Sequence, residues 1–514
     1  MPDARIDHAA LDKLFRPFDR TDAPGYAIGI AAPGQQPYRR GVGLASVELP
    51  VALSPSIRMR IGSTTKHFTA LSLLLLQEEG RLSLDDSPRR HLPELPDWAE
   101  AMTVRQLLAH TSGMRDSLDL LLFSAGAGQA ASAEFQRNYL ASLDGVNFAP
   151  GTSWNYNNGG YVLATEIVVR VGGASFADFL RNRVFAPVGM HDTLLRALDT
   201  DLLPNSATLH VPRPDGGWDR GVFGTAIGGE GGIASTADDM LRWLAHMRAP
   251  VVGTAESWAA IKTPQTTHGY GLGLFSEQRR GLQLFHHAGG VVGGSCQMVT
   301  VVEPALDIVL ISNGLPGFDG YRLVDTIIDH CIAGLPAAGS RAGSSRVVSG
   351  VFHSVATGRV IELAEQDGNQ AIRFGPVALA TTEDEEGALS VEIIPSDMRL
   401  RIAEDGGSIA LIEFGSEDLL TFVPPTDDVA AQAIGGRYAN APAAISVEID
   451  GDAVFMTVTG PLGSLRYRLK RLGDTLWDAR AEGVLPIAAT LEFDREGFLM
   501  TTGRTTRLRF GRAL

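Results

Sequence analysis

The spacing of apolar residues along the chain changes near residue 340, and the change predicts two kinds of structure. Before it, some apolar runs are long enough for buried helices, the clearest being Phe68 to Leu76. Tyr26 to Ala31 is a shorter apolar segment that is typical of an early strand. After it, short alternating segments are separated by Asp-Gly, Glu-Gly and Gly-Asp pairs, which indicate antiparallel hairpins.

Helical and strand patterns are mixed in the first part of the chain. Residues 104–109 and 161–171 have helical spacing. Three later segments, 284–285, 297–302 and 308–312, are predicted to be adjoining strands of one sheet. Strands at both ends of this part, with helices between them, favour an α+β layer structure.

The second part of the chain repeats a short pattern. Gly350-Val-Phe352 aligns with Gly436-Arg-Tyr438, and Ile361-Glu-Leu363 aligns with Val447-Glu-Ile449 at the same offset. The repeat predicts two related small antiparallel β-barrels. A stretch rich in glycine, alanine and serine precedes it and is typical of a linker. The predicted domains are 1–333, a linker at 334–346, and barrels at 347–427 and 430–514.

Composition and charge narrow the function classes. Of 514 residues, 44% are hydrophobic and 20% are charged, as expected for a globular protein with a sizeable core. The formal net charge of −15 argues against nucleic acid or an anionic membrane surface as a partner. The first residues lack the order of a signal peptide, so we expect a cytoplasmic protein. Cys296 and Cys331 lie in apolar surroundings and are expected to be buried free thiols.

The sequence from Ser63 to Lys66, just before the apolar run, is the first candidate for chemistry. Residues three apart on a helix share a face, so the two side chains should point into the same space. A serine hydroxyl needs an adjacent base, and a lysine serves if burial or positive charge lowers its pKa. A helix N-terminus would also favour developing negative charge. These residues predict a serine acyl-transfer site; for the motif alone, an ordinary helix start is the alternative.

Two further polar motifs follow. Tyr156 and Asn158 come after a turn-rich segment and could face one cleft, with a surface loop as the alternative. There the tyrosine could relay a proton and the asparagine could bind a substrate amide. His286-His287-Ala-Gly-Gly290 lies at the predicted edge of the sheet, where an imidazole could move protons. The sequence leaves open which histidine faces the cleft. No third ligand is at useful spacing, so we expect no metal; the family resemblance described next also implies no cofactor.

The order and spacing of these motifs resemble those of the penicillin-recognising serine hydrolases, on the class C β-lactamase side. That family carries Ser-x-x-Lys, then Tyr-x-Asn, then Lys-Thr-Gly or His-x-Gly, and the resemblance covers about residues 8–330. It implies an antiparallel sheet flanked by helices and an acyl-enzyme on serine. The implied site is Ser63 as nucleophile, Lys66 as base, Tyr156 as proton relay to the leaving group, Asn158 on the substrate carbonyl side, His287 in the place of the third-motif lysine followed by Gly289, and the N–H groups of Ser63 and Gly290 as oxyanion hole.

The two barrels and the His-x-Gly motif make the chain similar to the three-domain D-aminopeptidases of this family. That resemblance implies release of N-terminal D-residues such as D-alanine from short peptides, amides or esters, and an active-site loop from the last barrel that holds the free amine. Here the corresponding loop, about 479–489, is shorter, and Glu482 is its only carboxylate beyond strand-adjacent Asp478. A solvent-exposed hairpin tip is the alternative for Glu482.

The expected partner is therefore a small D-amino-acid peptide, amide or ester, with β-lactams as candidate inhibitors and a homodimer as the candidate assembly. Three alternatives stay open. They are a broad-specificity esterase or β-lactamase-like hydrolase, a DD-peptidase, and a non-enzymatic binding protein that uses the same fold.

Overall fold

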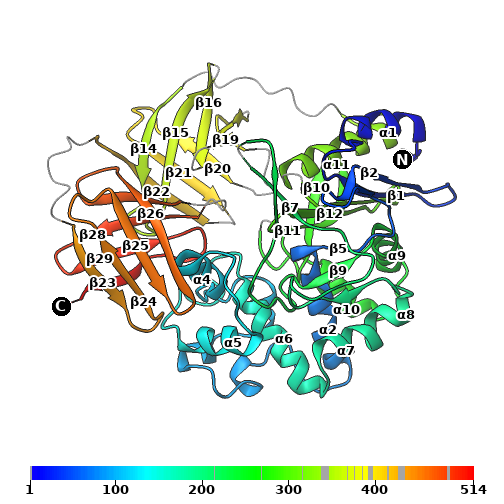
Figure 1. Cartoon of the computed structure of the whole chain (residues 1–514), viewed down its shortest axis with the longest axis horizontal. Coiled ribbons are helices and arrows are strands. Elements are labelled where there is room, and N and C mark those ends of the chain that lie inside the picture. The colour runs from blue at the N-terminus through cyan, green and yellow to red at the C-terminus, as the bar shows by residue number, and fades with distance from the viewer. Residues whose placement is uncertain are drawn as a thin grey trace. The chain divides into compact units, whose positions relative to one another are not determined.

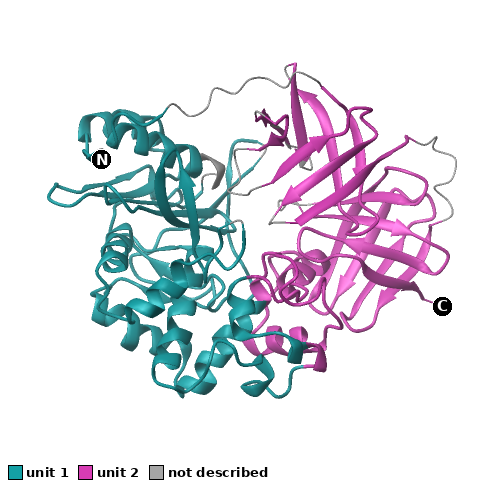
Figure 2. Ribbon diagram, turned by 180° about the vertical axis from the view of Figure 1, so that it is seen from behind, with its two compact units in different colours: residues 1–95, 99–109, 160–338 teal, residues 96–98, 110–159, 339–514 magenta. Residues whose placement is uncertain are grey.

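The computed structural model describes residues 3–213, 215–267, 269–314, 317–336, 347–366, 368–374, 377–384, 386–391, 398–413, 416–425, 434–482 and 487–513 (Figure 1). The chain divides into two compact units (Figure 2). Unit 1 comprises Met1–Leu95, Ala99–Ala109 and Gly160–Ala338, and unit 2 comprises Pro96–Trp98, His110–Gly159 and Gly339–Leu514. The predicted domain boundaries stay a prediction, because most of the predicted linker, 337–346, and residues 426–433 lie outside the described residues.

Unit 1 is built on a six-stranded antiparallel sheet in the order β10–β11–β12–β13–β1–β2. These strands are β10 (Phe275–Arg279), β11 (Leu282–Val291), β12 (Gly294–Val301), β13 (Leu306–Ser312), β1 (Tyr26–Ala31) and β2 (Tyr38–Val42). Strand β1, the first in the chain, pairs with β13, the strand of this sheet that comes latest in the sequence, and Tyr26 lies opposite Ser312. The predicted early strand and the three predicted adjoining strands are therefore confirmed.

Helices cover both faces of this sheet. Helices α1 (His8–Phe15) and α11 (Gly317–Cys331) pack on the face formed by alternate residues such as Ile28 and Ile30. Helix α9 (Ala237–Arg248) lies on the other face, where Gly29 leaves room for Leu241. Short strands β3 (Leu44–Ser46) to β9 (Ile233–Ser235) and helices α7 (Phe176–Leu180), α8 (Ala186–Val188) and α10 (Ala255–Lys262) complete the unit. No helix in the described part of the chain is long and apolar enough to span a membrane.

Three predicted helices of the first part are present. Helix α2 (Lys66–Glu78) is buried on all sides from Lys66 to Leu76, which explains why its apolar run is almost unbroken. Helix α3 (Val104–Leu108) begins with a capping box formed by Thr103 and Gln106. Helix α6 (Asn158–Gly172) covers the third predicted segment. Both cysteines are buried free thiols, as predicted.

Unit 2 contains helices α4 (Ser117–Ala125) and α5 (Ala133–Ser142) and two β-structures. The C-terminal one is a closed barrel of β23 (Gly436–Asn440), β24 (Ile445–Ile449), β25 (Phe455–Gly460), β26 (Gly463–Arg471), β27 (Leu476–Ala481), β28 (Ala488–Phe493), β29 (Gly497–Thr501) and β30 (Leu508–Arg512). Pairing of β23 with β30 closes the ring. The second predicted barrel is therefore present.

The other β-structure is a nine-stranded antiparallel sheet in the order β17–β16–β15–β14–β22–β21–β20–β19–β18. Its strands are β14 (Gly350–His353), β15 (Val360–Gln366), β16 (Asn369–Phe374), β17 (Val377–Ala380), β18 (Thr382–Glu383), β19 (Leu389–Ser390), β20 (Arg399–Ile402), β21 (Ser408–Glu413) and β22 (Ser416–Val423). Only Thr381 separates the two end strands, β17 and β18, so the sheet curls, but no pairing among the described residues joins β17 to β18. The first predicted barrel is therefore a curled sheet rather than a closed ring.

The predicted repeat corresponds to equivalent hairpins of these two structures. Phe352 pairs with Ile361 in the nine-stranded sheet, and Tyr438 pairs with Val447 in the barrel. The first strand of each hairpin begins at a glycine, Gly350 or Gly436, whose positive φ of 151° or 141° favours that residue. The positive φ at the start of each hairpin therefore explains the glycine of the repeated Gly-x-aromatic pattern.

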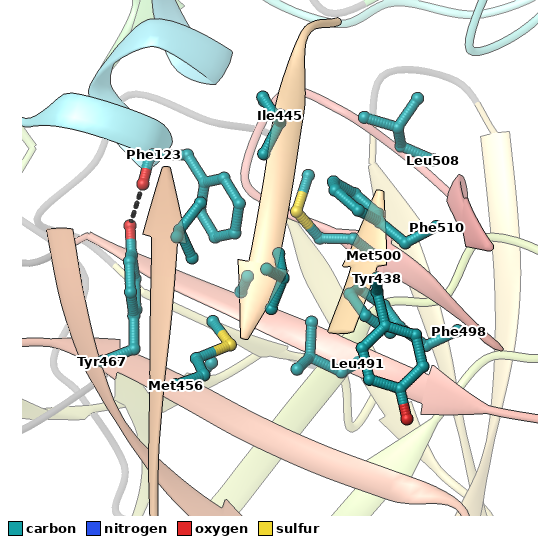
Figure 3. Close-up of a cluster of buried hydrophobic side chains, with 14 of the residues drawn as sticks. Phe123, Tyr438, Ile445, Met456, Tyr467, Leu491, Phe498, Met500, Leu508 and Phe510 are labelled. Atoms are coloured by element: carbon teal, nitrogen blue, oxygen red, sulfur yellow. Dashed lines mark hydrogen bonds between the residues drawn. The ribbon is translucent and has the colours of Figure 1, made fainter. Parts of the chain in front are cut away.

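The barrel shares its hydrophobic core with helices α4 and α5, whereas the nine-stranded sheet has a core of its own. In Figure 3 the ring of Phe123, from α4, lies among barrel side chains that include Ile445 and Met456. The Tyr467 hydroxyl donates a hydrogen bond of 2.6 Å to the carbonyl oxygen of Phe123. The segment between α3 and α6 is thus completed by the last strands of the chain.

Candidate active site

Ser63 and Lys66 lie on either side of a change in helix type. Ser63 belongs to the 3₁₀ turn Gly62–Thr65, and α2 begins at Lys66, whose N–H bonds the Ser63 carbonyl oxygen. Gly62 enables this turn, because its φ of 55° is left-handed. Ser63 therefore precedes the α-helix that was predicted to carry it. The side chains still meet: Lys66 Nζ donates to Ser63 Oγ at 3.2 Å.

The Lys66 amine is fully buried and has a second acceptor. Its Nζ donates to the carbonyl oxygen of Glu230 at 2.7 Å, and it lies 5.2 Å from the ring centroid of Tyr161. The loop that carries Glu230 is tight: a Cβ at Gly229 would lie 2.4 Å from the hydroxyl oxygen of Thr69. Our sequence analysis did not find this backbone acceptor. Its only signal is the Gly-Gly-Glu-Gly-Gly run at 228–232.

The third motif runs along β11 where the edge of the sheet is open. Strand β10 pairs only with residues 282–286 of β11, and no other described strand pairs with that side of residues 287–291. The turn before Ser63 lies there instead. A Cβ at Gly289 would be 1.8 Å from the Ile61 carbonyl oxygen and 3.1 Å from the Ser63 nitrogen. At Gly290, by contrast, no described atom lies within 4 Å of the Cβ position.

His287 is neutral and held in one tautomer. Its Nδ1 lies 2.6 Å from the carbonyl oxygen of Ala288, and because a carbonyl only accepts, Nδ1 carries the hydrogen. Its Nε2 then accepts from the Tyr270 hydroxyl at 3.1 Å. Burial, and next the charge of Lys66, lower the pKa of His287 to about 3. The imidazole is therefore uncharged at neutral pH, and its place as counterpart of the third-motif lysine stays a prediction.

His286 faces the other side of β11, as neighbouring strand residues do. Its Nε2 lies 3.0 Å from a carboxylate oxygen of Glu277, and its ring stacks on Phe275 with centroids 5.3 Å apart. Burial alone would raise the pKa of Glu277, but the hydrogen bond and charge of His286, with Arg279, lower it to about 2. The histidine on the Lys66 side is therefore His287.

The second motif lies in unit 2, just before the chain passes into unit 1 at Gly160. Asn157 fixes its backbone: its side-chain amide donates to the Met114 carbonyl oxygen at 2.6 Å, and its N–H donates to His110 Nδ1 at 3.1 Å. The ring centroid of Tyr156 lies 4.3 Å from that of His110. The Asn158 N–H donates to a carboxylate oxygen of Asp116 at 3.2 Å.

Two charged residues beside this motif were not found by sequence reasoning. Asp116 is the N-cap of α4 and accepts from the Leu118 N–H at 3.0 Å. Its other oxygen also accepts from Arg504 Nη1 at 3.2 Å, and the Arg504 guanidinium carbon lies 5.0 Å from the Tyr156 ring centroid. No local pattern marks this pair, because 388 residues separate its members.

Glu482, the predicted amine ligand, follows the end of β27. Its carboxylate lies 3.9 Å from Arg466 Nε, and 47% of its side chain is exposed. Its N–H donates to the Arg466 carbonyl oxygen at 2.9 Å, which continues the β26–β27 pairing by one residue. Residues 483–486 of the predicted loop lie outside the described residues. The role of Glu482 stays a prediction, and the structure gives its carboxylate a guanidinium partner.

Comparison with known proteins gives consistent matches. The Beta-lactamase family model matches residues 11–329. The D-aminopeptidase of Brucella melitensis biotype 2 is 27% identical over 493 residues, which are 92% of this chain and 90% of that protein. The D-aminopeptidase of Gluconobacter oxydans is 25% identical over 508 residues, or 94% of each chain.

Solved structures agree. The D-amino acid amidase of Ochrobactrum anthropi SV3, crystallised with L-phenylalanine amide, matches 59% of this chain and 88% of its own, with 27% identity and a TM-score of 0.51. The octameric penicillin-binding protein homologue of Pyrococcus abyssi matches 90% of this chain and 100% of its own, with a TM-score of 0.58. At 19% identity, that second match supports the fold alone.

Proposed function

Because the chain belongs to the Beta-lactamase family, we propose that it is a D-stereospecific serine hydrolase that releases N-terminal D-amino acids from short peptides, amides or esters. The observation that carries the proposal is the 3.2 Å hydrogen bond between the buried Lys66 amine and the Ser63 hydroxyl. The similarity to D-aminopeptidases over more than nine-tenths of the chain supports the substrate class.

In the proposed reaction Ser63 Oγ attacks the substrate carbonyl carbon while Lys66 accepts the hydroxyl proton. The N–H groups of Ser63 and Gly290 stabilise the oxyanion, an effect worth about 3–4 kcal/mol per donor in other hydrolases. The bond to the leaving nitrogen or oxygen breaks as Tyr156 passes on to it the proton that Lys66 took from Ser63, with Asn158 binding the substrate amide. Water then hydrolyses the ester on Ser63 and releases the D-amino acid. The roles of Tyr156 and Asn158 follow from their motif.

The neutral state of His287 bears on the alternatives. A DD-peptidase acts on chains that end in a carboxylate, and a cation beside the site would stabilise that group. His287 is uncharged at neutral pH, so it offers a hydrogen bond without an ion pair. This favours amides and esters, which lack that carboxylate, as substrates. The Glu482–Arg466 ion pair, in turn, favours the broad esterase as the second candidate, because the only predicted amine ligand already has a cationic partner.

The test is hydrolysis of D- and L-alanine p-nitroanilide, N-acetyl-D-alanine p-nitroanilide and p-nitrophenyl acetate. The proposal expects turnover of the free-amine D-anilide well above that of its L-isomer and of its acetylated form. Turnover of the acetate alone would identify an esterase and remove the aminopeptidase.

A pair of variants then examines Glu482. If its carboxylate binds the substrate amine, Glu482→Gln reduces the preference for the free amine over the acetylated substrate at least several-fold. Glu448→Gln is the matched control, because Glu448 also pairs with a barrel arginine, Arg437, at 3.5 Å. Equal preferences in the two variants would exclude Glu482 from amine recognition.

A further inference from the structure

The loop between β29 and β30 is fixed to the segment that carries Tyr156. The Asn147 side chain donates to the carbonyl oxygen of Arg504 at 2.8 Å and accepts from the Thr506 N–H at 3.0 Å. The Thr505 hydroxyl donates to Asp119 of α4 at 2.9 Å, and Thr502 donates to the same oxygen. All of these residues belong to unit 2. The main chain on both sides of Arg504 is thus held in place.

The Arg504 side chain extends from this loop to the second motif. Its Nη1 donates to Asp116, which has no exposed side-chain surface, while 36% of the Arg504 side chain is exposed. The Asp116 oxygen that accepts from Arg504 also accepts from the Asn158 N–H, two residues after Tyr156. One carboxylate oxygen therefore links the arginine to the tyrosine segment, and the guanidinium lies over the tyrosine ring at 5.0 Å.

The charges near Tyr156 favour a lasting positive charge there. Burial alone would lower the pKa of Arg504, but Asp116, then Tyr156 and Asp119, raise it. Besides these groups, the rings of His110 and Trp154 lie against Tyr156 in unit 2. His110 Nδ1 accepts the Asn157 N–H, so the ring is held in a hydrogen bond that a protonated Nδ1 could not make. A cation over an aromatic ring attracts it, and attracts the phenolate more strongly than the phenol.

We propose that Arg504, supplied by the C-terminal barrel and oriented by Asp116, is a positioning residue that holds Tyr156 and favours its phenolate form. The inference rests on the proposed function, in which Tyr156 moves the proton that the leaving group needs. As phenolate Tyr156 accepts the Ser63 proton from Lys66, and as phenol it gives that proton to the leaving nitrogen or oxygen, so the phenolate and the neutral Lys66 amine are both restored in each cycle.

The experiment compares kcat/KM as a function of pH for wild type, Arg504→Gln, Arg504→Lys and Arg507→Gln, with both the D-alanine p-nitroanilide and p-nitrophenyl acetate. On the acid side of the profile, kcat/KM falls as Tyr156 becomes protonated, and this part of the curve is the acid limb. Loss of the cation makes the phenolate harder to form, so Arg504→Gln should move the acid limb to higher pH by about one unit. At pH values below the limb its kcat/KM falls about tenfold, and at high pH it approaches the wild-type value.

The other two variants separate charge from structure. Arg504→Lys keeps the positive charge and should keep most of the limb position. Arg507 lies on the same loop, but its Nη1 binds the Val355 carbonyl oxygen at 2.7 Å and Glu492 at 2.9 Å. Arg507→Gln should therefore leave the acid limb in place. A uniform loss of kcat/KM in Arg504→Gln, with an unmoved limb, would make Arg504 a purely structural residue and overturn the proposal.

A second readout does not depend on activity. Tyrosinate absorbance is titrated in wild type and in Tyr156→Phe, and the difference gives the titration of Tyr156 itself. The same difference measured in the Arg504→Gln background should lie at higher pH; an unchanged difference would contradict the proposal. Failure of the proposed function would look different from failure of the Arg504 proposal. In that case wild type would not hydrolyse the D-anilide, or Tyr156→Phe would retain wild-type turnover.

Discussion

The motif residues of unit 1 and those of unit 2 are held in different ways. In unit 1, Lys66 and His287 are buried, and backbone carbonyl oxygens of Glu230 and Ala288 accept their hydrogen bonds. In unit 2, Tyr156 and Asn158 lie beside an ion pair whose arginine comes from the end of the chain. Backbone carbonyl oxygens hold the side chains in the first case, whereas in the second an ion pair adds its charge to the hydrogen bonds of Asn157. The two should therefore respond differently to substitution and to pH.

The largest expected effect is on chemistry in unit 1. Ser63→Ala removes the nucleophile, and we expect turnover of every substrate to fall by about a thousandfold or more. The half-buried alanine should leave thermal unfolding nearly unchanged. Steady-state rates check the first point, and a thermal unfolding curve checks the second. Residual activity above about a hundredth of wild type would refute the nucleophile assignment.

Lys66→Met should be nearly as severe, because a nucleophile and its base act as a unit. Its effect on stability should be small or even favourable, because an apolar side chain of similar volume replaces a fully buried amine. Kinetics and chemical denaturation on the same preparation measure the two effects. A large loss of stability would show that the Lys66–Glu230 contact also holds the fold of unit 1.

Two neighbouring glycines provide a matched pair on β11. Gly289→Ala would place a methyl group 1.8 Å from the Ile61 carbonyl oxygen, so we expect a loss of stability of about 2–4 kcal/mol and little activity. Gly290→Ala meets no described atom within 4 Å and should change the free energy of unfolding by less than about 1 kcal/mol. Equal destabilisation of both variants would refute the close approach of β11 and the Ser63 turn.

Acid should affect the two units in opposite directions. Below the unfolded pKa of 6.5, the unfolded chain binds protons that His287 (folded pKa about 3) and His246 (about 4) do not bind when folded. The free energy of unfolding therefore decreases as the pH is lowered through this window, by about 1.4 kcal/mol per pH unit for each histidine. In unit 2, burial and Asp116 raise the pKa of Asp119 to about 6, so between 3.8 and 6 the folded carboxyl holds more protons and gains stability on acidification.

Urea denaturation between pH 4 and pH 7 compares these contributions. His287→Gln should flatten the dependence of unfolding free energy on pH, whereas Asp119→Asn should steepen it. The Asp119 effect should be the smaller one, because its pKa moves from 3.8 to about 6, whereas that of His287 moves from 6.5 to about 3. If both variants changed the pH dependence of the unfolding free energy in the same direction, the opposite contributions expected for His287 and Asp119 would be contradicted.

How much the sequence revealed depends on how local each feature is. The helix at 66–78, the strand at 26–31 and the Ser63–Lys66 pair follow from neighbouring residues, and all are present. The Glu230 carbonyl oxygen could not be predicted as the acceptor for Lys66, because every residue has a carbonyl oxygen. Only the folded structure determines which of them lies within hydrogen-bond distance of the lysine. Asp116 and Arg504 are ordinary charged residues until β30 closes the barrel. The 3₁₀ turn at Ser63 was not predicted, because it depends on the left-handed φ of Gly62, a backbone conformation that the apolar pattern does not reveal.

The core shared by the barrel with α4 has a consequence for how this protein is made. Phe123 and Tyr467 are 344 positions apart, so the support for the tyrosine segment is synthesised long after that segment. Native contacts of such long range form late, and domains complete in order of synthesis. A nascent or truncated chain that lacks the final strands would carry a complete Ser63–Lys66 pair without the core and the arginine that support Tyr156. Turnover should thus arise only after the barrel strands β23 to β30 have been synthesised and have packed on α4.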